Sequence, residues 1–393
     1  MSEEKNEQAA CMLPTGEKLV LSSSPHISAP DTVRKIMYKV LLALVPAVLA
    51  GIWFFGLRAL LVIVATVVFC VGAEALWCAL AKKPVRATIA DGSAAVTGVL
   101  LALNLPPAVP LYVPLIGAFL AIWLGKQVYG GIGNNPFNPA LVARVGLLIA
   151  LPAAMTSWTP PRGMDQNDEE LELFCSPQTI EALSSGAKLD AVTCATPLGI
   201  VSTTPKIVDN DDAVSHPTSK NSAEYMTAED NFSAVDNDSM LWNYFIGRRA
   251  GCIGETCAPA LLLGAVILIA FNLINWRVPL CFAGTVVVIT GIVNFFFPGV
   301  TPTPLFHLLT GGLLLGAIFM ATDMVTCPIT GNGCVIFAIG CGVITSVIRI
   351  WGNYPEGVSF SILFMNALVP LIDRWCSVRP FGYVPQRKGG ESK

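Results

Sequence analysis

Ten stretches of mostly apolar residues limit what this chain can fold into. They cover approximately 36–56, 58–80, 90–105, 110–128, 138–156, 256–275, 278–298, 305–324, 333–351 and 357–374. A helix of about 20 apolar residues crosses the hydrocarbon core of a membrane. Charged residues make up only 13% of the chain, about half the share that is usual in soluble domains. The sequence therefore predicts an all-α, polytopic membrane protein with about ten transmembrane helices.

Basic residues indicate how these helices are oriented. Threading ten spans through the membrane places three basic groups on one side, which the positive-inside rule makes the cytoplasmic side. The groups are Arg34, Lys35 and Lys39, then Lys82, Lys83 and Arg86, and finally Arg374, Arg379, Arg387, Lys388 and Lys393. Arg248 and Arg249 form the one discordant pair. Residues 1–30 lack a basic stretch followed by an apolar run, so we expect no signal peptide.

The same threading divides the chain into five parts. We expect a cytoplasmic N-terminal segment, a first five-helix repeat, an extracytoplasmic loop, a second five-helix repeat and a cytoplasmic C-terminal tail. Their bounds are 1–35, 36–156, 157–250, 251–374 and 375–393. Within the loop, residues 161–240 contain 15 acidic and four basic side chains. The stretch 209–239 holds few aliphatic residues, a composition that predicts a disordered insert.

Similar sequences in the two halves indicate an internal repeat. TGVLLAL begins at Thr97 and TGGLLLG at Thr310, and a Gly-Asn pair follows at Gly133 and again at Gly352. With five spans in each half, the second copy enters the membrane from the opposite face. Inverted repeats of this kind build many transporters, whose sites lie at the repeat interface. Chance similarity between glycine-rich apolar helices is the alternative.

Two segments rich in helix-breaking residues follow apolar spans. GGIGNNPFNPA covers 130–140 and ATDMVTCPITGNG covers 321–333. Non-helical backbone at membrane depth persists only where protein buries it or where it lines a wet cavity. Because the segments occupy matching places in the two halves, we predict a half-buried functional site at the breaks. Two ordinary surface loops are the alternative.

Acidic residues inside apolar spans are costly and point to function by default. Glu74 lies well inside the second span, whereas Asp91, Asp323 and Asp373 lie at span ends. Carboxylates at span ends also serve as ordinary helix-end residues. We take Glu74, Asp91 and Asp323 as candidates for an ion path, and Glu74 is the hardest of them to explain otherwise.

The 12 cysteines do not follow a metal-binding pattern. No CxxC pair occurs, and Cys327, Cys334 and Cys341 recur at intervals of seven residues. We interpret them as packing residues and predict no metal site. Cys175 and Cys194 both lie in the expected extracytoplasmic loop, where a disulfide can form. The three histidines are scattered and indicate no catalytic group.

A short stretch of small and hydroxyl-bearing residues, DAVTCATPLG at 190–199, lies in the polar loop. Thr193 and Thr196 flank Cys194 and Ala195, and Pro197 follows directly. A hydroxyl is a weak nucleophile unless another group activates it. Either these hydroxyls form ordinary turn hydrogen bonds, or another protein modifies one of them.

Five stretches together resemble the D subunit of the Rnf complex, an ion-translocating ferredoxin:NAD+ oxidoreductase. They are SSSPHISAPDTVRKIMYKVLLALVPA (22–47), GGIGNNPFNPALVAR (130–144), GETCAPALLLGAVIL (254–268), GAIFMATDMVTCP (316–328) and GVSFSILFMNALVPLID (357–373). The resemblance covers about residues 20–375, apart from the polar insert. The B subunit of the Na+-translocating NADH:quinone reductase shares the fold but carries a longer N-terminal extension. A redox-inert channel or transporter also fits ten spans, without accounting for the 190–196 motif.

The resemblance implies that FMN is attached covalently to this chain. In this family a flavin transferase recognises Asp-x-x-Ser/Thr-Gly-Ala-Thr and joins FMN through its phosphate to the last threonine. The pattern maps onto Asp190, Thr193, Ala195 and Thr196, with Thr196 as the phosphoester site and Cys194 in place of the usual glycine. The chain would then carry electrons as one part of a larger assembly and not form a complete enzyme.

The resemblance also implies partners and a location. We expect a second, non-covalent flavin (riboflavin) near the cytoplasmic side and other Rnf subunits that hold further flavins and iron–sulfur centres. We further expect coupling of electron transfer to Na+ or H+ movement, and no nucleic-acid partner. The expected location is the bacterial cytoplasmic membrane, with both termini cytoplasmic and the flavin loop extracytoplasmic.

Overall fold

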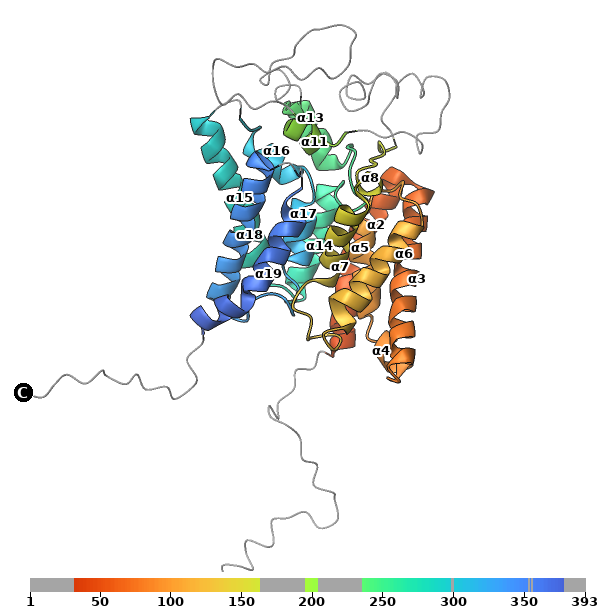
Figure 1. The fold of residues 1–393 in the computed structure, drawn as a ribbon. Coiled ribbons are helices and arrows are strands. Elements are labelled where there is room, and N and C mark those ends of the chain that lie inside the picture. Colours follow the sequence, from red (N-terminus) through yellow and green to blue (C-terminus); the bar gives the residue numbers. More distant parts are fainter. Residues whose placement is uncertain are drawn as a thin grey trace, which may run out of the picture.

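The structure of the protein is a computed structural model that describes residues 32–162, 195–203, 235–297, 300–352, 354 and 356–377. The elements of these ranges are helices, most of them running roughly along one direction (Figure 1). The all-α prediction is therefore confirmed for the described part of the chain. Five helices there are long and apolar enough to cross a membrane: α2 (Val33–Phe55), α3 (Leu57–Leu80), α15 (Arg277–Phe296), α18 (Gly331–Trp351) and α19 (Val358–Trp375).

The other five apolar stretches form helices that are short or interrupted. The shorter helices are α5 (Ser93–Leu103), α7 (Pro139–Ala150), α8 (Pro152–Met155) and α14 (Ala258–Ala270). The interrupted ones are α6 (Tyr112–Phe119), which continues as the π-helix η1 (Leu120–Gln127), and α16 (Pro304–Leu309), followed by α17 (Leu313–Leu315) and the π-helix η3 (Gly316–Met320). Ten complete crossings therefore stay a prediction.

Local sequence explains where α5 ends. Pro106 and Pro107 have no backbone N–H, so the helix cannot continue through them. The side chain of Asn104 donates from Nδ2 to the carbonyl of Leu100 at 2.7 Å, which satisfies a buried amide inside the protein. The break therefore leaves a polar side chain, 2% exposed, at the end of a buried apolar helix.

The two halves of the chain pack in a similar order. In the first half α3 contacts α5 and α6, and η1 contacts α7; in the second half α15 contacts α16 and α18, and α18 contacts α19. The halves meet where α2 lies against α14 and where α19 lies against α7. The first of these contacts is close, because a Cβ on Gly264 would lie 2.5 Å from the carbonyl oxygen of Ala43. Small residues permit such close approach between membrane helices.

The two ends of the molecule differ. Helices α11 (Pro197–Thr203) and α13 (Asp238–Ile246) lie at the upper end in Figure 1, and α4 (Val85–Ile89) lies at the lower end. Between the ends, the long helices expose large apolar side chains, among them Trp53 and Phe295, which are 79% and 81% exposed. Such a surface is suited to lipid and not to water. These helices are compatible with a polytopic membrane protein.

Part of the loop expected at 157–250 lies outside the described residues. This applies to most of the predicted insert at 209–239 and to Cys175 and Cys194, the two cysteines of the predicted disulfide. These predictions and the five domain bounds are not tested by the described helices.

Candidate functional site

Thr196 stands directly before α11 and is 8% exposed. Its Oγ1 accepts a hydrogen bond of 3.0 Å from the backbone N–H of Gly199, and its carbonyl accepts one from Ile200. This is the geometry of a helix N-cap, with Pro197 at the first helical position, where a missing N–H is harmless. The hydroxyl oxygen acts as an acceptor here, so this structural role does not need its proton.

The rest of the predicted flavin-attachment motif is only partly described. Ala195 is exposed beside Thr196. Asp190, Thr193 and Cys194 lie outside the described residues. The structure therefore places the proposed acceptor and not the residues proposed for its recognition.

A small cavity lies beside Thr196. Its walls come from α11, from the loop before α14 and from the segments before α17 and α19. The lining residues are Thr196, Pro197, Leu198, Arg249, Ala250, Glu255, Gly311 and Glu356. Thr196 therefore lies near the charged side chains of Arg249, Glu255 and Glu356, which are distant from it in the sequence.

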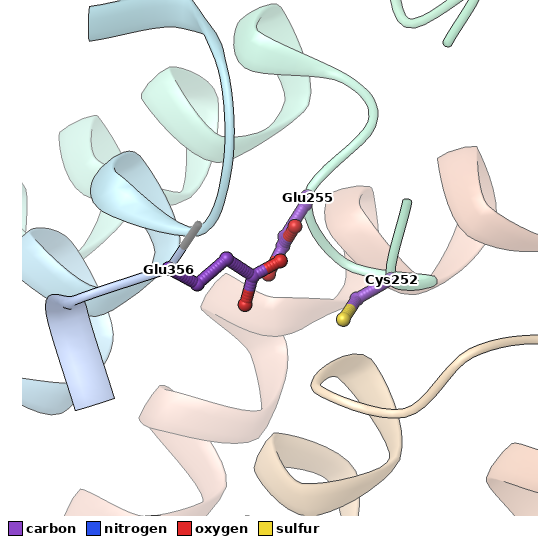
Figure 2. Close-up of side chains that lie close together, drawn as sticks. All are labelled: Cys252, Glu255 and Glu356. Atoms are coloured by element: carbon purple, nitrogen blue, oxygen red, sulfur yellow. The ribbon is translucent and has the colours of Figure 1, made fainter. Parts of the chain in front are cut away.

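Arg144 on α7 holds two carboxylates from the other half of the chain. Its Nη2 lies 3.2 Å from Oε1 of Glu255 and contacts Oε2 of Glu356. Its Nη1 donates to Oδ1 of Asn104. Figure 2 shows Glu255 and Glu356 reaching toward each other from separate segments. Two ionised carboxylates this close repel each other unless a cation lies between them, and Arg144 supplies it.

Cys252 lies beside the same carboxylates (Figure 2), and the ligand atoms of Cys252, Glu255 and Glu356 are within 4.8 Å of one another. Two features argue against interpreting this group as a metal site. Arg144 already pairs with both carboxylates, and burial raises the pKa of the Cys252 thiol, whereas a metal binds the thiolate. The Cys252 Sγ instead donates to the carbonyl of Asn104 at 3.3 Å. We interpret the group as a buried ion-pair network.

Two more arginines lie buried nearby. Arg249 donates to the backbone carbonyls of Leu309 and Glu255. Arg349 donates to the carbonyls of His307 at 2.6 Å and Thr310 at 3.2 Å. The carbonyls of 307, 309 and 310 belong to the end of α16, where backbone acceptors lack helical partners. Arg249 did not fit the positive-inside pattern of the sequence because it is buried and caps this helix end inside the protein. Its neighbour Arg248 is exposed.

A larger cavity is lined by both halves of the chain. Most of its lining is apolar, with Ile36, Met37 and Val40 of α2 on one side and Phe319 of η3 on another. Its polar lining includes Lys126, Asn135, Asn138 and Asp323. The two broken segments, 130–140 and 321–333, therefore contribute to one cavity, and they are not two separate surface loops.

Asn138 connects these two halves directly. Its Oδ1 accepts from the N–H of Ala140 and caps α7, while its Nδ2 donates to the carbonyl of Met320 at 3.3 Å. The backbone before it turns sharply, since Gly130, Gly131 and Gly133 all have positive φ angles. Such angles are open to glycine at little cost, which explains why glycines occupy this break.

Glu74 is fully buried on α3 and pairs with a residue that the sequence patterns did not single out. Lys126 on η1 donates from Nζ to Oε1 of Glu74 at 2.5 Å and to Oγ of Ser93 at 2.6 Å. Gln127 donates to the same carboxylate oxygen at 2.8 Å. Asp91 joins this network through Ser93, whose Oγ lies 2.6 Å from Asp91 Oδ1.

The three candidate acids therefore meet at the larger cavity. Asp323 lines it, while Glu74 and Asp91 are linked to it through Lys126 and Ser93, which also line it. Asp91 caps α5 as well, because its Oδ1 accepts from the N–H of Ser93 at 2.8 Å. Asp373 lies outside this network and accepts from the N–H of Ile329 at 3.1 Å, as expected for a residue at a helix end.

Two of the regularly spaced cysteines, Cys334 and Cys341, lie on α18 and belong to the hydrophobic core. Cys327 precedes this helix and packs against the core, with its sulfur 3.7 Å from that of Cys334. In such surroundings cysteine behaves as a small apolar residue.

Five charged residues of the two sites were not predicted. Lys126, Arg144 and Arg349 could have been found from the sequence, because each is a charged residue within an apolar span. A basic residue in such a place points to function as much as an acidic one does. Glu255 and Glu356 lie in short connections between helices. Their importance follows only from Arg144, which lies 111 and 212 residues away in the sequence.

Comparison with known proteins places these observations in a family, and three relatives illustrate it. Each is the D subunit of an ion-translocating complex. The chain is 40% identical over 366 residues to that of the proton-translocating ferredoxin:NAD(+) oxidoreductase complex of Clostridium ljungdahlii, covering 92% of this chain and 96% of the relative. It is 41% identical over 356 residues to that of the ion-translocating oxidoreductase complex of Stutzerimonas stutzeri, covering 90% and 93%. It is 37% identical over 374 residues to that of the Na(+)-translocating ferredoxin:NAD(+) oxidoreductase complex of Acetobacterium woodii, covering 94% and 97%.

A family model matches as well, over residues 20–382. That range includes all the described helices, both cavities and the 190–196 motif. Together with the relatives, it confirms the resemblance drawn from the sequence motifs. The chain belongs to the NQR2, RnfD, RnfE family.

Proposed function

We propose that this chain is the flavin-carrying D subunit of an Rnf-type, ion-translocating ferredoxin:NAD+ oxidoreductase, with FMN bound covalently through its phosphate to Thr196. The names of the relatives support membership of such a complex. The motif from Asp190 to Thr196 supports the flavin. The observation that carries the proposal is that Thr196, the last residue of this motif, faces a cavity lined by arginine.

The charged residues that line the cavity beside Thr196 are Arg249, Glu255 and Glu356. Arg249 lines the small cavity, and although burial lowers its pKa to about 10, its guanidinium stays charged at neutral pH. Because Thr196 is 8% exposed, we infer that α11 docks here after the transferase has acted.

The division of labour follows from this placement. FMN supplies the electron-transfer chemistry when bound. The chain anchors its phosphate, orients it and shields it from water. Cys194 stands where the motif usually has glycine; its side chain would slow modification if that position needs a positive φ.

The larger cavity is our candidate for the second, non-covalent flavin. It is lined by both halves of the chain, and most of its lining is apolar. Apolar residues such as Phe319 would cover the faces of a ring, while Asn135, Asn138 and Lys126 offer hydrogen-bond donors at its edge.

Glu74, Asp91 and Asp323 are the proposed ion path, now extended to include Lys126. Lys126 and Asp323 line the larger cavity, and Glu74 and Asp91 are connected to it through Lys126 and Ser93. The transported ion is Na+ or H+. Relatives that are 40% and 37% identical are named for protons and for Na+, respectively, so similarity favours neither.

The proposed setting is the bacterial cytoplasmic membrane, in contact with the other Rnf subunits. Ten crossings in two inverted five-helix repeats place α4 and its basic residues in the cytoplasm and Thr196 outside. The similar packing order of α3, α5 and α6 and of α15, α16 and α18 supports the repeat. A flavin transferase is the partner needed for maturation.

Two other functions remain as alternatives. The B subunit of a Na+-translocating NADH:quinone reductase belongs to the same family, and the composition of the purified complex distinguishes it: an Rnf complex oxidises ferredoxin, while the reductase reduces quinone. A redox-inert channel would carry no flavin on any residue.

Denaturing gel electrophoresis tests the proposed function. The chain co-expressed with a flavin transferase should fluoresce under ultraviolet light, because a phosphoester survives denaturation. Thr196→Val removes the oxygen, keeps the shape and should abolish fluorescence while the chain still reaches the membrane. Thr193→Val should lower loading and leave the acceptor in place. A fluorescent Thr196→Val band would overturn the site, and a dark wild-type band would favour the channel.

A further inference from the structure

Two thiols face each other at the start of α18. The sulfur of Cys327 lies 3.7 Å from that of Cys334; Cys327 is half-buried and Cys334 is 6% exposed. Cys334 donates from Sγ to the carbonyl of Pro328 at 3.1 Å. Because a thiol has one proton, the Cys334 sulfur acts as the acceptor toward Cys327. The nine cysteines of the described ranges, all free thiols, form no second contact of this kind.

The backbone between the two cysteines holds them in this arrangement. Thr330 caps α18, because its Oγ1 accepts from the N–H of Gly333 at 3.0 Å. A Cβ on Gly333 would lie 2.7 Å from Thr330 Oγ1 and 3.0 Å from Pro328 Cβ. A side chain at this position would therefore push the segment away from the first turn of α18. The approach of the two sulfurs follows from the geometry of this glycine-containing turn.

The turn lies at the end of the broken segment 321–333, which contributes to the larger cavity. Asp323 lines that cavity, and its carbonyl accepts from the N–H of Cys327 at 3.1 Å. The N–H of Ile329 donates to Asp373, so the turn lies beside the end of α19, at the lower end of Figure 1. In the proposed orientation this end faces the cytoplasm. Thiols are kept reduced there, and the disulfides that do form are usually transient and catalytic or redox-sensing.

We propose that Cys327 and Cys334 form a reversible dithiol–disulfide site, with low-molecular-weight disulfides as its oxidants. The sulfurs are 3.7 Å apart. A disulfide bond is about 2.0 Å long, so closure needs a movement of roughly 1.7 Å that the two side chains share. The closed bond would fasten the end of the cavity-lining segment to the first turn of α18.

Closure takes two exchange steps. Half-buried Cys327 loses its proton, and its thiolate attacks one sulfur of the oxidant; the oxidant's own S–S bond breaks and releases a thiolate, which takes up a proton. Cys334 then loses its proton and attacks the Cys327 sulfur, which releases the second half of the oxidant as a thiol. In total the two cysteines lose two electrons and two protons, and the oxidant gains them.

Mass spectrometry of the complex tests the site, with oxidised glutathione as the probe. Membranes that hold the complex are treated with the probe, free thiols are alkylated, and the chain is digested with chymotrypsin. Cleavage at Phe337 separates the two cysteines from Cys341. We expect the wild-type peptide to lose two hydrogens and to take up no alkyl group at Cys327 or Cys334. Dithiothreitol should restore both thiols.

Two serine variants separate the two steps. Cys334→Ser lacks the second thiol, so Cys327 should stay joined to glutathione. Cys327→Ser leaves only the buried Cys334, which should take up little glutathione. Cys376, half-buried at the end of α19, is the matched control, because it contacts no other thiol in the described part of the chain. It should carry glutathione and form no disulfide.

The wild-type peptide decides between the outcomes. Glutathione held on Cys327 beside a free Cys334 would show that the turn cannot close. Two free thiols after treatment would show that the site is not oxidised, whatever Cys376 does. Either result overturns the proposal.

Hydrogen–deuterium exchange of the same samples measures the restraint on the segment. Oxidation should slow exchange of the backbone N–H groups of 325–333 several-fold in the wild type and leave it unchanged in Cys327→Ser. Equal exchange in the oxidised and reduced wild type, with the disulfide formed, would show that the bond does not restrain the segment and would overturn that part of the proposal.

Discussion

Lys126 and Glu74 form an ion pair with 2.5 Å between Nζ and Oε1, and their side chains are 4% and 0% exposed. They come from η1 and α3 and are 52 residues apart in the sequence. The other carboxylate oxygen of Glu74 has no hydrogen-bond partner among the described residues. The pair therefore makes a buried acid tolerable, and Glu74 stays our proposed member of the ion path.

Removing the lysine of this pair should strongly destabilise the protein. Lys126→Met leaves the Glu74 carboxylate buried without its cation, and the loss of one partner of a buried pair costs about 3–5 kcal/mol. We expect a clear fall in Tm and in the amount of chain in the membrane. The double variant Lys126→Met/Glu74→Gln removes both charges and should recover most of the loss. A double variant no more stable than Lys126→Met would show that the lysine acts through packing alone.

Glu74→Gln tests the ion path. The amide keeps the size of the side chain but cannot bind a proton or Na+ as the carboxylate does. We expect fewer ions moved per electron in membrane vesicles, with flavin loading unchanged. Asp373→Asn is the control, because Asp373 bonds a helix end outside the network. An unchanged ratio of ions to electrons in Glu74→Gln would remove Glu74 from the path.

Arg144 should be required for the two halves to stay together. Arg144→Met leaves Glu255 and Glu356 close to each other without a cation, and we expect a loss of about 3–5 kcal/mol in the free energy of unfolding. Arg58→Met, which changes an exposed arginine, should be nearly neutral. Thermal stability of the membrane-embedded chain measures both. Equal stability of the two variants would mean that Arg144 is not a structural clamp.

Cysteine labelling tests the topology. A membrane-impermeant reagent applied to sealed cells should label Arg248→Cys and Asn221→Cys, and it should not label Lys83→Cys beyond the level of the wild-type chain. Lys83 precedes α4, at the end of the molecule opposite α11 and α13 (Figure 1). Labelling of Lys83→Cys from outside would contradict both the proposed orientation and the inverted repeat.

The sequence by itself determined the features that depend on local pattern. Apolar stretches of membrane-spanning length identify an all-helical membrane protein, since a chain in lipid must satisfy its backbone hydrogen bonds within each helix. Motifs such as GGIGNNPFNPA and the residues from Asp190 to Thr196 identified the family, and the match over residues 20–382 confirmed it. The glycines and asparagines of the breaks also showed in advance where regular helix would end.

The tertiary structure decided which charges meet. Glu74 was singled out from the sequence, but Lys126 as its partner was not, because a π-helix turns that lysine toward α3. Arg144 meets Glu255 and Glu356 across the contact between the two halves, and Arg349 reaches the carbonyls of His307 and Thr310 at the end of α16. Hydrophobic pattern and local motifs act over a few residues, whereas a buried charge is stabilised by whatever the packed helices bring beside it. That choice of neighbours is a property of the fold.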